Sequence, residues 1–150
     1  MDPAGEFPLI SYLIDLFCLA VCPNLTTLSE TSGVITSPFY PRYYQNNQRC
    51  SWQITASKGK RIVLDIEYMS IKYCGACSCH YLEIVSGLSS DGVTFGRKCG
   101  YMRSTSYFSF GESLKVLFVS DAESWYGGFK ATYTQVNNTG KFKKSIFVCY

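Results

Sequence analysis

The chain contains short segments in which apolar residues recur at every second position, and others that are nearly all apolar. Residues 50–55, 62–67 and 129–134 alternate, whereas 81–85 and 114–119 are apolar runs. Successive side chains of a β-strand point to opposite faces, so alternation predicts a strand with one buried and one solvated face. A short run that is nearly all apolar predicts a strand that is covered on both faces. We therefore expect these five segments to be strands, with 114–119 doubly covered in the centre of a sheet.

The alternation also predicts which side chains form the core. On the first two alternating segments the apolar face carries Cys50, Trp52, Ile54, Ile62, Leu64 and Ile66. Clusters of Gly, Ser and Asp separate the segments, and these residues favour turns. No window of the sequence shows a sustained helical period. Short strands separated by turns predict an all-β fold, a sandwich of two antiparallel sheets.

Composition and charge limit the class of protein. The 150 residues suffice for one domain with tails, and 47% hydrophobic and 16% aromatic residues provide for a core. The net charge is only +3, and the one basic cluster (Lys141, Lys143 and Lys144) falls near the C-terminus. We therefore expect no nucleic-acid partner.

Eight cysteines in so short a chain indicate disulfides and an oxidising compartment. Two N-glycosylation sequons begin at Asn24 and Asn137, in agreement with secretion. These features predict a secreted or extracellular glycoprotein.

The two ends of the chain differ from its middle. Residues 7–21 are mostly apolar, and Cys18 and Ala20 offer small residues before a cleavage ahead of Val21, although Asp2 and Asp15 are atypical of a signal peptide. We interpret residues 1–21 as a signal peptide or another leader, 22–135 as the folded domain, and 136–150 as a truncated or disordered tail. The apolar run is too short for a membrane span, so a membrane link would come only through a larger parent protein.

Several separated motifs carry a family resemblance. In chain order they are Gly33 and Ile35; Ser37-Pro38-Phe39-Tyr40-Pro41 with Tyr44, Asn47, Cys50 and Trp52; Leu82-Glu83-Ile84 with Gly87; Cys99-Gly100; Phe118-Val119-Ser120-Asp121; and Gly128-Phe129-Lys130-Ala131-Thr132-Tyr133. Together they resemble the CUB domain of the CUB and spermadhesin-like family. The resemblance implies a jelly-roll-like sandwich that binds extracellular proteins or glycans.

The resemblance also implies the disulfide pairing. It pairs Cys22 with Cys50 and Cys77 with Cys99, which leaves Cys74 and Cys79 to close a small extra loop. The exchange Cys74–Cys99 with Cys77–Cys79 stays open, although a bridge across one residue is strained. Cys149 then has no partner unless Cys18 is retained.

A zinc site is a rival interpretation of the same cysteines. Four soft ligands, Cys74, Cys77, Cys79 and His80, lie within seven residues. Zinc requires reduced thiolates, which an oxidising compartment disfavours.

Many CUB domains hold calcium with three acidic side chains. The matching positions here are Lys72, His80 and Asp121, so only Asp121 is retained. A hard dication needs several oxygen ligands, and we predict that this calcium site is degenerate. A His80–Asp121 contact or a Lys72–Asp121 ion pair is expected to replace the ion as the tie between loops. Glu123 is expected to be a solvated charge.

The sequence predicts a non-catalytic module without a cofactor. The chain has one histidine, and no hydrolase motif or phosphate-binding loop is present. The leading interpretation is a recognition module for an extracellular protein or glycan, independent of calcium; a structural spacer and the zinc module are the alternatives. The candidates for its binding edge are Lys72, His80, Asp121, Trp125 and Tyr126.

Overall fold

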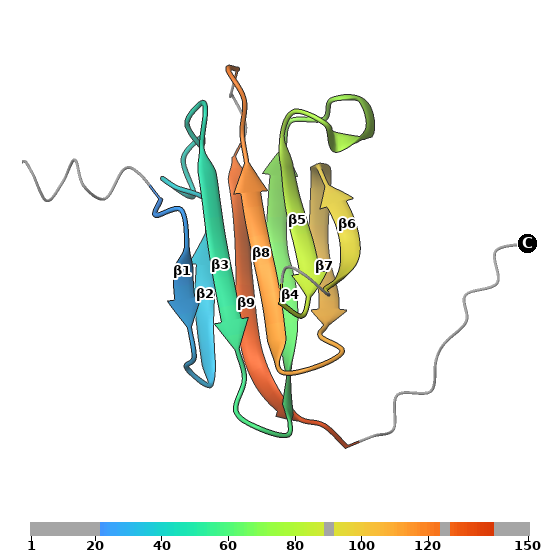
Figure 1. Cartoon of the computed structure of the whole chain (residues 1–150). Coiled ribbons are helices and arrows are strands. Elements are labelled where there is room, and N and C mark those ends of the chain that lie inside the picture. The colour runs from blue at the N-terminus through green and yellow to red at the C-terminus, as the bar shows by residue number, and fades with distance from the viewer. Residues whose placement is uncertain (1–21, 89–91, 124–126, 140–150) are drawn as a thin grey trace, which may run out of the picture.

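The protein folds as a two-layer β-sandwich (Figure 1). A computed structural model of the chain describes residues 22–88, 92–123 and 127–139. The strands within these residues are β1 Thr26–Leu28, β2 Ser32–Thr36, β3 Arg49–Thr55, β4 Lys60–Ile71, β5 Tyr81–Ser86, β6 Val93–Lys98, β7 Gly100–Phe108, β8 Ser113–Val119 and β9 Gly128–Asn137, and one 3-10 turn, η1, spans Gly75–Cys77. The predicted all-β class is confirmed.

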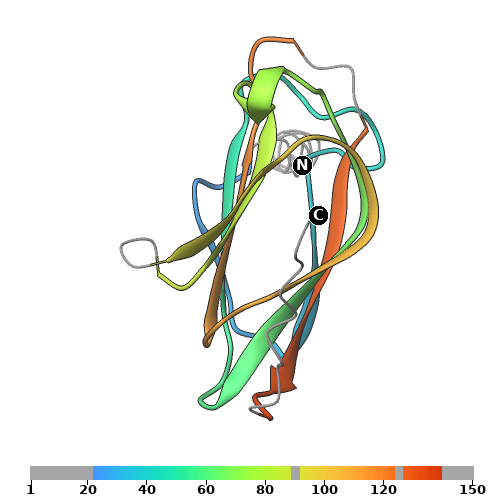
Figure 2. The same ribbon diagram turned by 90° about the vertical axis from the view of Figure 1, so that its right-hand side faces the viewer.

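Two sheets form the layers, and Figure 2 shows them edge-on. The five-stranded sheet has the order β1-β3-β8-β5-β6, and the four-stranded sheet has the order β2-β9-β4-β7. Neighbouring strands are antiparallel, except for the short parallel pair of β1 with β3. Apart from β5 and β6, which pair with each other in one sheet, consecutive strands lie in opposite sheets. This is the jelly-roll-like arrangement that the resemblance implies.

The core lies between the inner faces of the sheets. The side chains that alternation placed inward, from Cys50 to Ile66, are buried, and Trp52 is the most exposed of them. Aromatic rings connect the layers: Phe129 of β9 lies edge-on to Trp52 of β3, with ring centroids 5.7 Å apart, and tilted against Phe118 of β8 at 5.6 Å. Such pairs add to the stabilisation that burial provides.

Strand β8 corrects one expectation. It does lie in the middle of the five-stranded sheet, between β3 and β5. However, only Leu114, Val116 and Phe118 are fully buried, whereas Leu117 and Val119 on the opposite face are partly exposed. The nearly apolar run therefore marks a central strand that is covered on one face only, because the outer face of a two-layer sandwich meets solvent.

The ends of the strands position the loops. Strands β4 and β8 end, and β3 and β5 begin, at the end of the sandwich that is uppermost in Figure 1. The connection from β2 to β3 is anchored there by Ser37, whose N–H donates to the carbonyl of Phe129 and whose hydroxyl accepts the N–H of Phe129. In the part of the chain that the structure describes, no helix has the length and apolar character needed to cross a bilayer.

Candidate functional site

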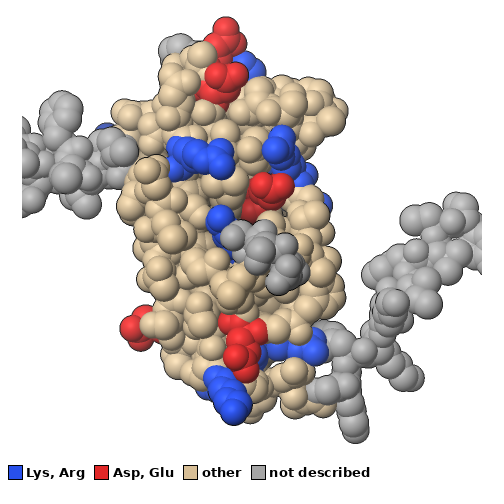
Figure 3. Space-filling view, viewed as in Figure 1, with Lys and Arg blue, Asp and Glu red and all other residues tan. Residues whose placement is uncertain are grey.

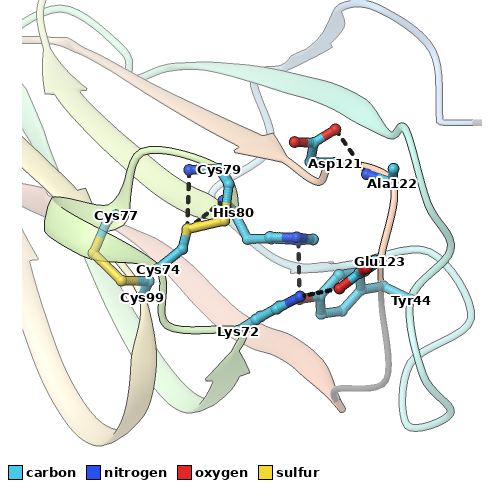
Figure 4. The surroundings of a disulfide bond; sticks show 10 residues. All are labelled: Tyr44, Lys72, Cys74, Cys77, Cys79, His80, Cys99, Asp121, Ala122 and Glu123. Carbon is cyan, nitrogen blue, oxygen red and sulfur yellow. Dashed lines mark hydrogen bonds and ion pairs between the residues drawn. A yellow bond between two sulfur atoms is a disulfide. The ribbon is translucent and has the colours of Figure 1, made fainter.

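Three loops meet at the upper end of the sandwich, and we call this region the loop edge. It comprises residues 37–48, 72–80 and 120–123. Disulfides fix the middle loop: Cys74–Cys79 closes it on itself, and Cys77–Cys99 joins it to the start of β7 (Figure 4). The sulfur of Cys74 also accepts the backbone N–H groups of Cys79 and His80, at 3.0 and 3.3 Å.

The structure thus contains the same three cysteine pairs that the resemblance implies, including Cys22–Cys50. The exchange of Cys74 with Cys77 does not occur. Because Cys74, Cys77 and Cys79 are oxidised, they offer no thiolates for zinc. Cys18 and Cys149 lie outside the described residues.

Beneath the loop edge, a buried tyrosine connects two of the three loops. The hydroxyl of Tyr44 accepts the backbone N–H of Lys72 at 3.1 Å and lies 3.3 Å from Nδ1 of His80. Tyr44 and His80 are each only 1% exposed. The hydroxyl has one proton and a second lone pair, so it can donate to an unprotonated Nδ1 or accept from a protonated one, according to the tautomer of the imidazole.

The surroundings of His80 favour the neutral imidazole over the imidazolium. Burial lowers the pKa of His80 below its usual value, and the positive charge of Lys72 lowers it further. The carboxylates of Asp121 and Glu123 oppose this shift without reversing it. Burial decides the direction because the imidazolium is the form that loses hydration.

An ion pair closes the top of the loop edge. The Nζ of Lys72 lies 2.9 Å from Oε2 of Glu123, and the Glu123 side chain is 78% exposed. The hydrogen bond from Lys72 lowers the pKa of Glu123. The ion pair of Lys72 is therefore with Glu123 and not, as expected, with Asp121. His80 and Asp121 line the same hollow, and the charge of Asp121 acts on His80.

Asp121 has one partner in its own loop and one in the loop 37–48 instead. Its carboxylate accepts the N–H of Ala122 at 2.7 Å, and its carbonyl accepts the N–H of Asn47 at 3.1 Å. Glu123, and not Asp121, forms the ion pair with Lys72 because it lies further along the loop and its side chain extends back toward Lys72 (Figure 4).

A hollow of about 220 Å³ opens between these groups. It is lined by Lys72, Cys79, His80, Asp121, Ala122 and Glu123. The three predicted edge residues with described positions thus surround one space.

The donors of this hollow do not fit calcium. Calcium takes six to eight oxygen ligands and favours carboxylates, but only Asp121 and Glu123 supply them, and the ammonium of Lys72 already engages Glu123. Among residues 22–88, 92–123 and 127–139 no group of three or more His, Cys, Asp or Glu is placed to hold a metal ion. The hollow thus holds one protein cation, the ammonium of Lys72, beside its two carboxylates.

Ser120 is a tie between loops that the sequence did not reveal. Its hydroxyl donates to the carbonyl of Gln45 at 2.7 Å and accepts the N–H of Gln48 at 2.9 Å. Ser120, Tyr44 and Glu123 thus belong to the loop edge although the sequence did not make them candidates for it. The first two belong to motifs quoted for the resemblance, which was the only signal for them.

The remaining predicted sites are peripheral or fall outside the description. Trp125 and Tyr126 lie outside the described residues. Asn24 precedes β1 and Asn137 ends β9, and both are exposed. Exposure is what a glycosylated asparagine needs, and glycosylation of either stays a prediction.

The outer face of the five-stranded sheet shows no dominant charge. Figure 3 shows Lys and Arg interspersed with Asp and Glu across this face and at the loop edge. A mixed surface of this kind gives no continuous positive stripe of the sort that nucleic-acid binding uses.

A disulfide-stapled sandwich with this loop edge defines a class of extracellular β-module, and comparison with known proteins identifies it. The CUB domain family matches residues 22–133, so the chain belongs to the CUB domain family. Mouse procollagen C-endopeptidase enhancer 2 is 32% identical over 114 residues, which cover 76% of this chain and 27% of the relative. The chain therefore spans about a quarter of that relative's length.

Solved structures agree. The extracellular region of zebrafish Gpr126/Adgrg6 superposes with a TM-score of 0.67 at 27% identity, over 78% of this chain and 15% of that one. The MASP-1 CUB2 domain, in a crystal structure bound to Ca²⁺, superposes with a TM-score of 0.65 at 26% identity, over 73% of this chain and 96% of that domain. CUB domains are non-catalytic modules of secreted and extracellular proteins, and the chain is one of them.

Proposed function

We propose that this domain is a recognition module that binds an extracellular protein through the loop edge, and that this binding does not depend on calcium. One observation carries the proposal: the chain's own groups hold the three loops together. The Lys72–Glu123 ion pair and the Tyr44–His80 hydrogen bond take the place that a calcium ion would otherwise have. Loops that are ordered in this way present a fixed surface, which lowers the entropic cost of binding.

Exposed tyrosines at the loop edge support a protein partner. Tyr43 and Tyr73 are 62% and 70% exposed, and each belongs to one of the loops that the edge comprises. Tyrosine is enriched where protein interfaces concentrate their binding energy. Trp125 and Tyr126 follow Glu123 in sequence, and we include them in the proposed surface.

The calcium part of the proposal is tested on the unliganded domain. We expect the midpoint of thermal unfolding to be the same with millimolar calcium as with excess EDTA, because a ligand stabilises a fold only if it binds the folded state. A midpoint that rises with calcium concentration would contradict calcium independence.

The partner is sought with a tetramerised domain on an array of extracellular proteins, in EDTA throughout. We expect a reproducible partner whose affinity falls at least about tenfold in the variants Tyr43→Ala and Tyr73→Ala, as hot-spot truncations do. Phe110→Ala is the matched control: Phe110 is 61% exposed and follows β7 at the opposite end of the sandwich. An array without a reproducible partner would favour a structural spacer instead.

A further inference from the structure

The bridge Cys74–Cys79 closes a much smaller loop than the other two disulfides that the structure describes. Its two cysteines are 5 residues apart in the chain, whereas the other bridges join residues 22 and 28 apart. A disulfide stabilises a fold more when the loop that it closes is longer. The two long bridges therefore hold the sandwich together, and Cys74–Cys79 can open while the fold is retained.

The long bridges and the short bridge also differ in their surroundings. Cys50 is fully buried in the core, and Cys22 and Cys99 pack against it. By contrast, Cys74 and Cys79 lie in a loop and are partly exposed. Cys79 also lines the hollow of the loop edge. A small reagent in solvent therefore reaches the short bridge more readily than the long ones, and it does so from the side of Cys79.

The sulfur of Cys74 is placed to hold a negative charge. It accepts the backbone N–H groups of Cys79 and His80, at 3.0 and 3.3 Å (Figure 4). Consecutive backbone N–H groups that converge on one atom form an anion-binding site. Hydrogen bonds to an ionised acceptor are about twice as strong as those to a neutral one. When the bridge opens, these two donors therefore stabilise Cys74 as the thiolate.

The backbone of the same loop is strained. Ala76 and Cys77, which are consecutive, both have a left-handed backbone, with φ of 54° and 53°. Residues other than glycine rarely adopt this conformation, because Cβ then lies close to the following carbonyl oxygen. Strained backbone of this kind concentrates at functional sites. Opening of Cys74–Cys79 removes one of the covalent constraints on the loop, so relief of this strain favours the open form.

The charges of the hollow select the reagent. The carboxylates of Asp121 and Glu123 line it together with one cation, the ammonium of Lys72. His80 adds no positive charge at neutral pH, because burial lowers its pKa. The excess of one negative charge repels an anionic reagent and attracts a cationic one.

We propose that Cys79 is a site of thiol–disulfide exchange, at which a small thiol, with preference for a cationic aminothiol, forms a mixed disulfide. The thiolate of the reagent attacks Sγ of Cys79 from the hollow and a new S–S bond forms. The bond to Cys74 breaks, and its electron pair remains on Sγ of Cys74, the sulfur that the two N–H groups stabilise. A leaving thiolate that is stabilised in this way departs faster.

The mixed disulfide has two further reactions. In the reverse step the thiolate of Cys74 attacks Sγ of Cys79 and expels the small thiolate, which restores the bridge. In the forward step a second thiolate attacks the sulfur of the bound reagent, so that the small disulfide is the oxidised product and both cysteines are reduced. This inference does not rest on the proposed function, because the bridge exchanges whether or not the loop edge binds a protein.

The first test uses the whole oxidised chain under native conditions. Free thiols are blocked with N-ethylmaleimide, excess reagent is removed, and cysteamine is added. Cysteines that become free are alkylated with iodoacetamide and located by tandem mass spectrometry. We expect Cys74–Cys79 to open at least about tenfold faster than the two long bridges, which serve as internal controls. In samples that are quenched early in acid, the cysteamine adduct should be on Cys79.

The preference for charge is tested with three thiols of similar size: cysteamine, mercaptoethanol and mercaptoacetate, which are cationic, neutral and anionic. Each rate is divided by the rate of the same thiol toward oxidised mercaptoethanol, a neutral disulfide, so that differences in intrinsic reactivity cancel. We expect the cationic thiol to be the fastest and the anionic thiol the slowest.

Two variants test the role of the N–H groups. Cys79→Ser leaves the thiol of Cys74 beside its two donors, and Cys74→Ser leaves the thiol of Cys79 as the matched control. The rate of labelling by iodoacetamide is followed against pH for each thiol, by mass spectrometry of its peptide. We expect the midpoint for Cys74 to be at least about one pH unit lower than that for Cys79. Thermal unfolding shows that each variant retains the fold.

Every other outcome overturns a stated part of the proposal. Equal rates for all three bridges, or earlier opening of a long bridge, would remove the exchange site. An adduct on Cys74, or the same labelling midpoint in both variants, would contradict Cys74 as the stabilised leaving group. A fastest reaction with mercaptoacetate would exclude the aminothiol. None of these measurements uses a protein partner, so their failure is distinct from failure of the proposed function.

Discussion

Tyr44 and His80 lie 36 residues apart in the chain and share a hydrogen bond in the interior, with the tyrosine hydroxyl 3.3 Å from Nδ1 of the imidazole. The same hydroxyl accepts the backbone N–H of Lys72, so this side chain of the loop 37–48 holds both ends of the loop 72–80. The ring of Tyr44 lies edge-on to Phe118, with centroids 5.2 Å apart. The residue that hydrogen-bonds the two loops together therefore also packs in the hydrophobic core, and it connects the loop edge to that core.

Removal of this hydroxyl should destabilise the domain. Tyr44→Phe keeps the ring and leaves the N–H of Lys72 and Nδ1 of His80 without their partner. A buried unsatisfied group costs about 1–3 kcal/mol, and we expect a loss of that size in the free energy of unfolding, measured by urea denaturation. Tyr43→Phe, at the exposed neighbouring position, should change the free energy by no more than about 0.5 kcal/mol. Equal effects of the two substitutions would contradict the role of the hydroxyl.

Stability should decrease in mild acid. Burial lowers the pKa of folded His80 below its value of about 6.5 in the unfolded chain, so the unfolded state binds a proton that the folded state resists. The contribution of His80 is then complete above about pH 6.5 and is lost as pH falls toward the folded pKa. For one proton the slope of the free energy of unfolding is at most about 1.4 kcal/mol per pH unit. Urea denaturation at several pH values between about 7.5 and 5 measures it.

The chain has a single histidine, so a change of stability in this pH range can be assigned to His80. His80→Asn should flatten the dependence above about pH 5, while both proteins lose further stability below about pH 4.5. In that lower window Glu67 and Glu123, whose pKa values are lowered by their lysine partners, become protonated. A wild-type stability that is constant between about pH 7 and 5 would contradict the prediction.

The five segments that periodicity predicts are the interior strands of the two sheets. Strands β3, β4, β5, β8 and β9 each have neighbours on both sides, and β1, β2, β6 and β7 are the edges. An interior strand buries one face completely, so its sequence alternates or is apolar. Edge strands β6 and β7 contain no fully buried residue. Their mixed sequences suit an exposed edge and carry no clear period, so single-sequence patterns did not reveal them.

The loop edge was predictable only in part. Its position in sequence follows from the motifs, and the structure does gather Lys72, His80 and Asp121 around one hollow. Which groups pair there could not be predicted. Glu123 is 51 residues from Lys72, and the two come together only because of the conformations of two different loops. Loop conformation depends on backbone hydrogen bonds, such as those made by Ser120, and no residue period encodes them.

Reversal of one charge should create a response to calcium. Lys72→Glu removes the ammonium and places a third carboxylate beside those of Asp121 and Glu123. We expect calcium to stabilise this variant, by about 2.7 kcal/mol at a concentration one hundred times its dissociation constant. Differential scanning calorimetry with calcium, magnesium and EDTA measures the effect. Lys58→Glu makes the same charge change at an exposed position between β3 and β4, and it should give no response. A response of both variants would show that net charge, and not the loop edge, is responsible.

The start of β9 gives a prediction that separates backbone strain from steric contact. Gly128 and Gly59 have nearly the same left-handed backbone, with φ of 77° and 78°. A Cβ at Gly59 would meet nothing within 4 Å, whereas a Cβ at Gly128 would lie 1.9 Å from Oγ of Ser37. Gly59→Ala should therefore cost only the conformational strain, about 1–2 kcal/mol. Gly128→Ala should cost at least about 2 kcal/mol more, because Ser37 must move and its hydrogen bonds with Phe129 are then lost.

A double-mutant cycle identifies the cause of the larger loss. If the hydroxyl of Ser37 is the obstacle, Ser37→Ala combined with Gly128→Ala should be less destabilised than the sum of the two single variants, since contacting residues are not additive. Urea denaturation of the four proteins in the cycle gives this interaction energy. Additive losses of unfolding free energy, or equal losses at Gly59 and Gly128, would mean that the connection from β2 to β3 moves easily to accommodate the added methyl group. In that case Ser37 would not anchor the loop edge to β9.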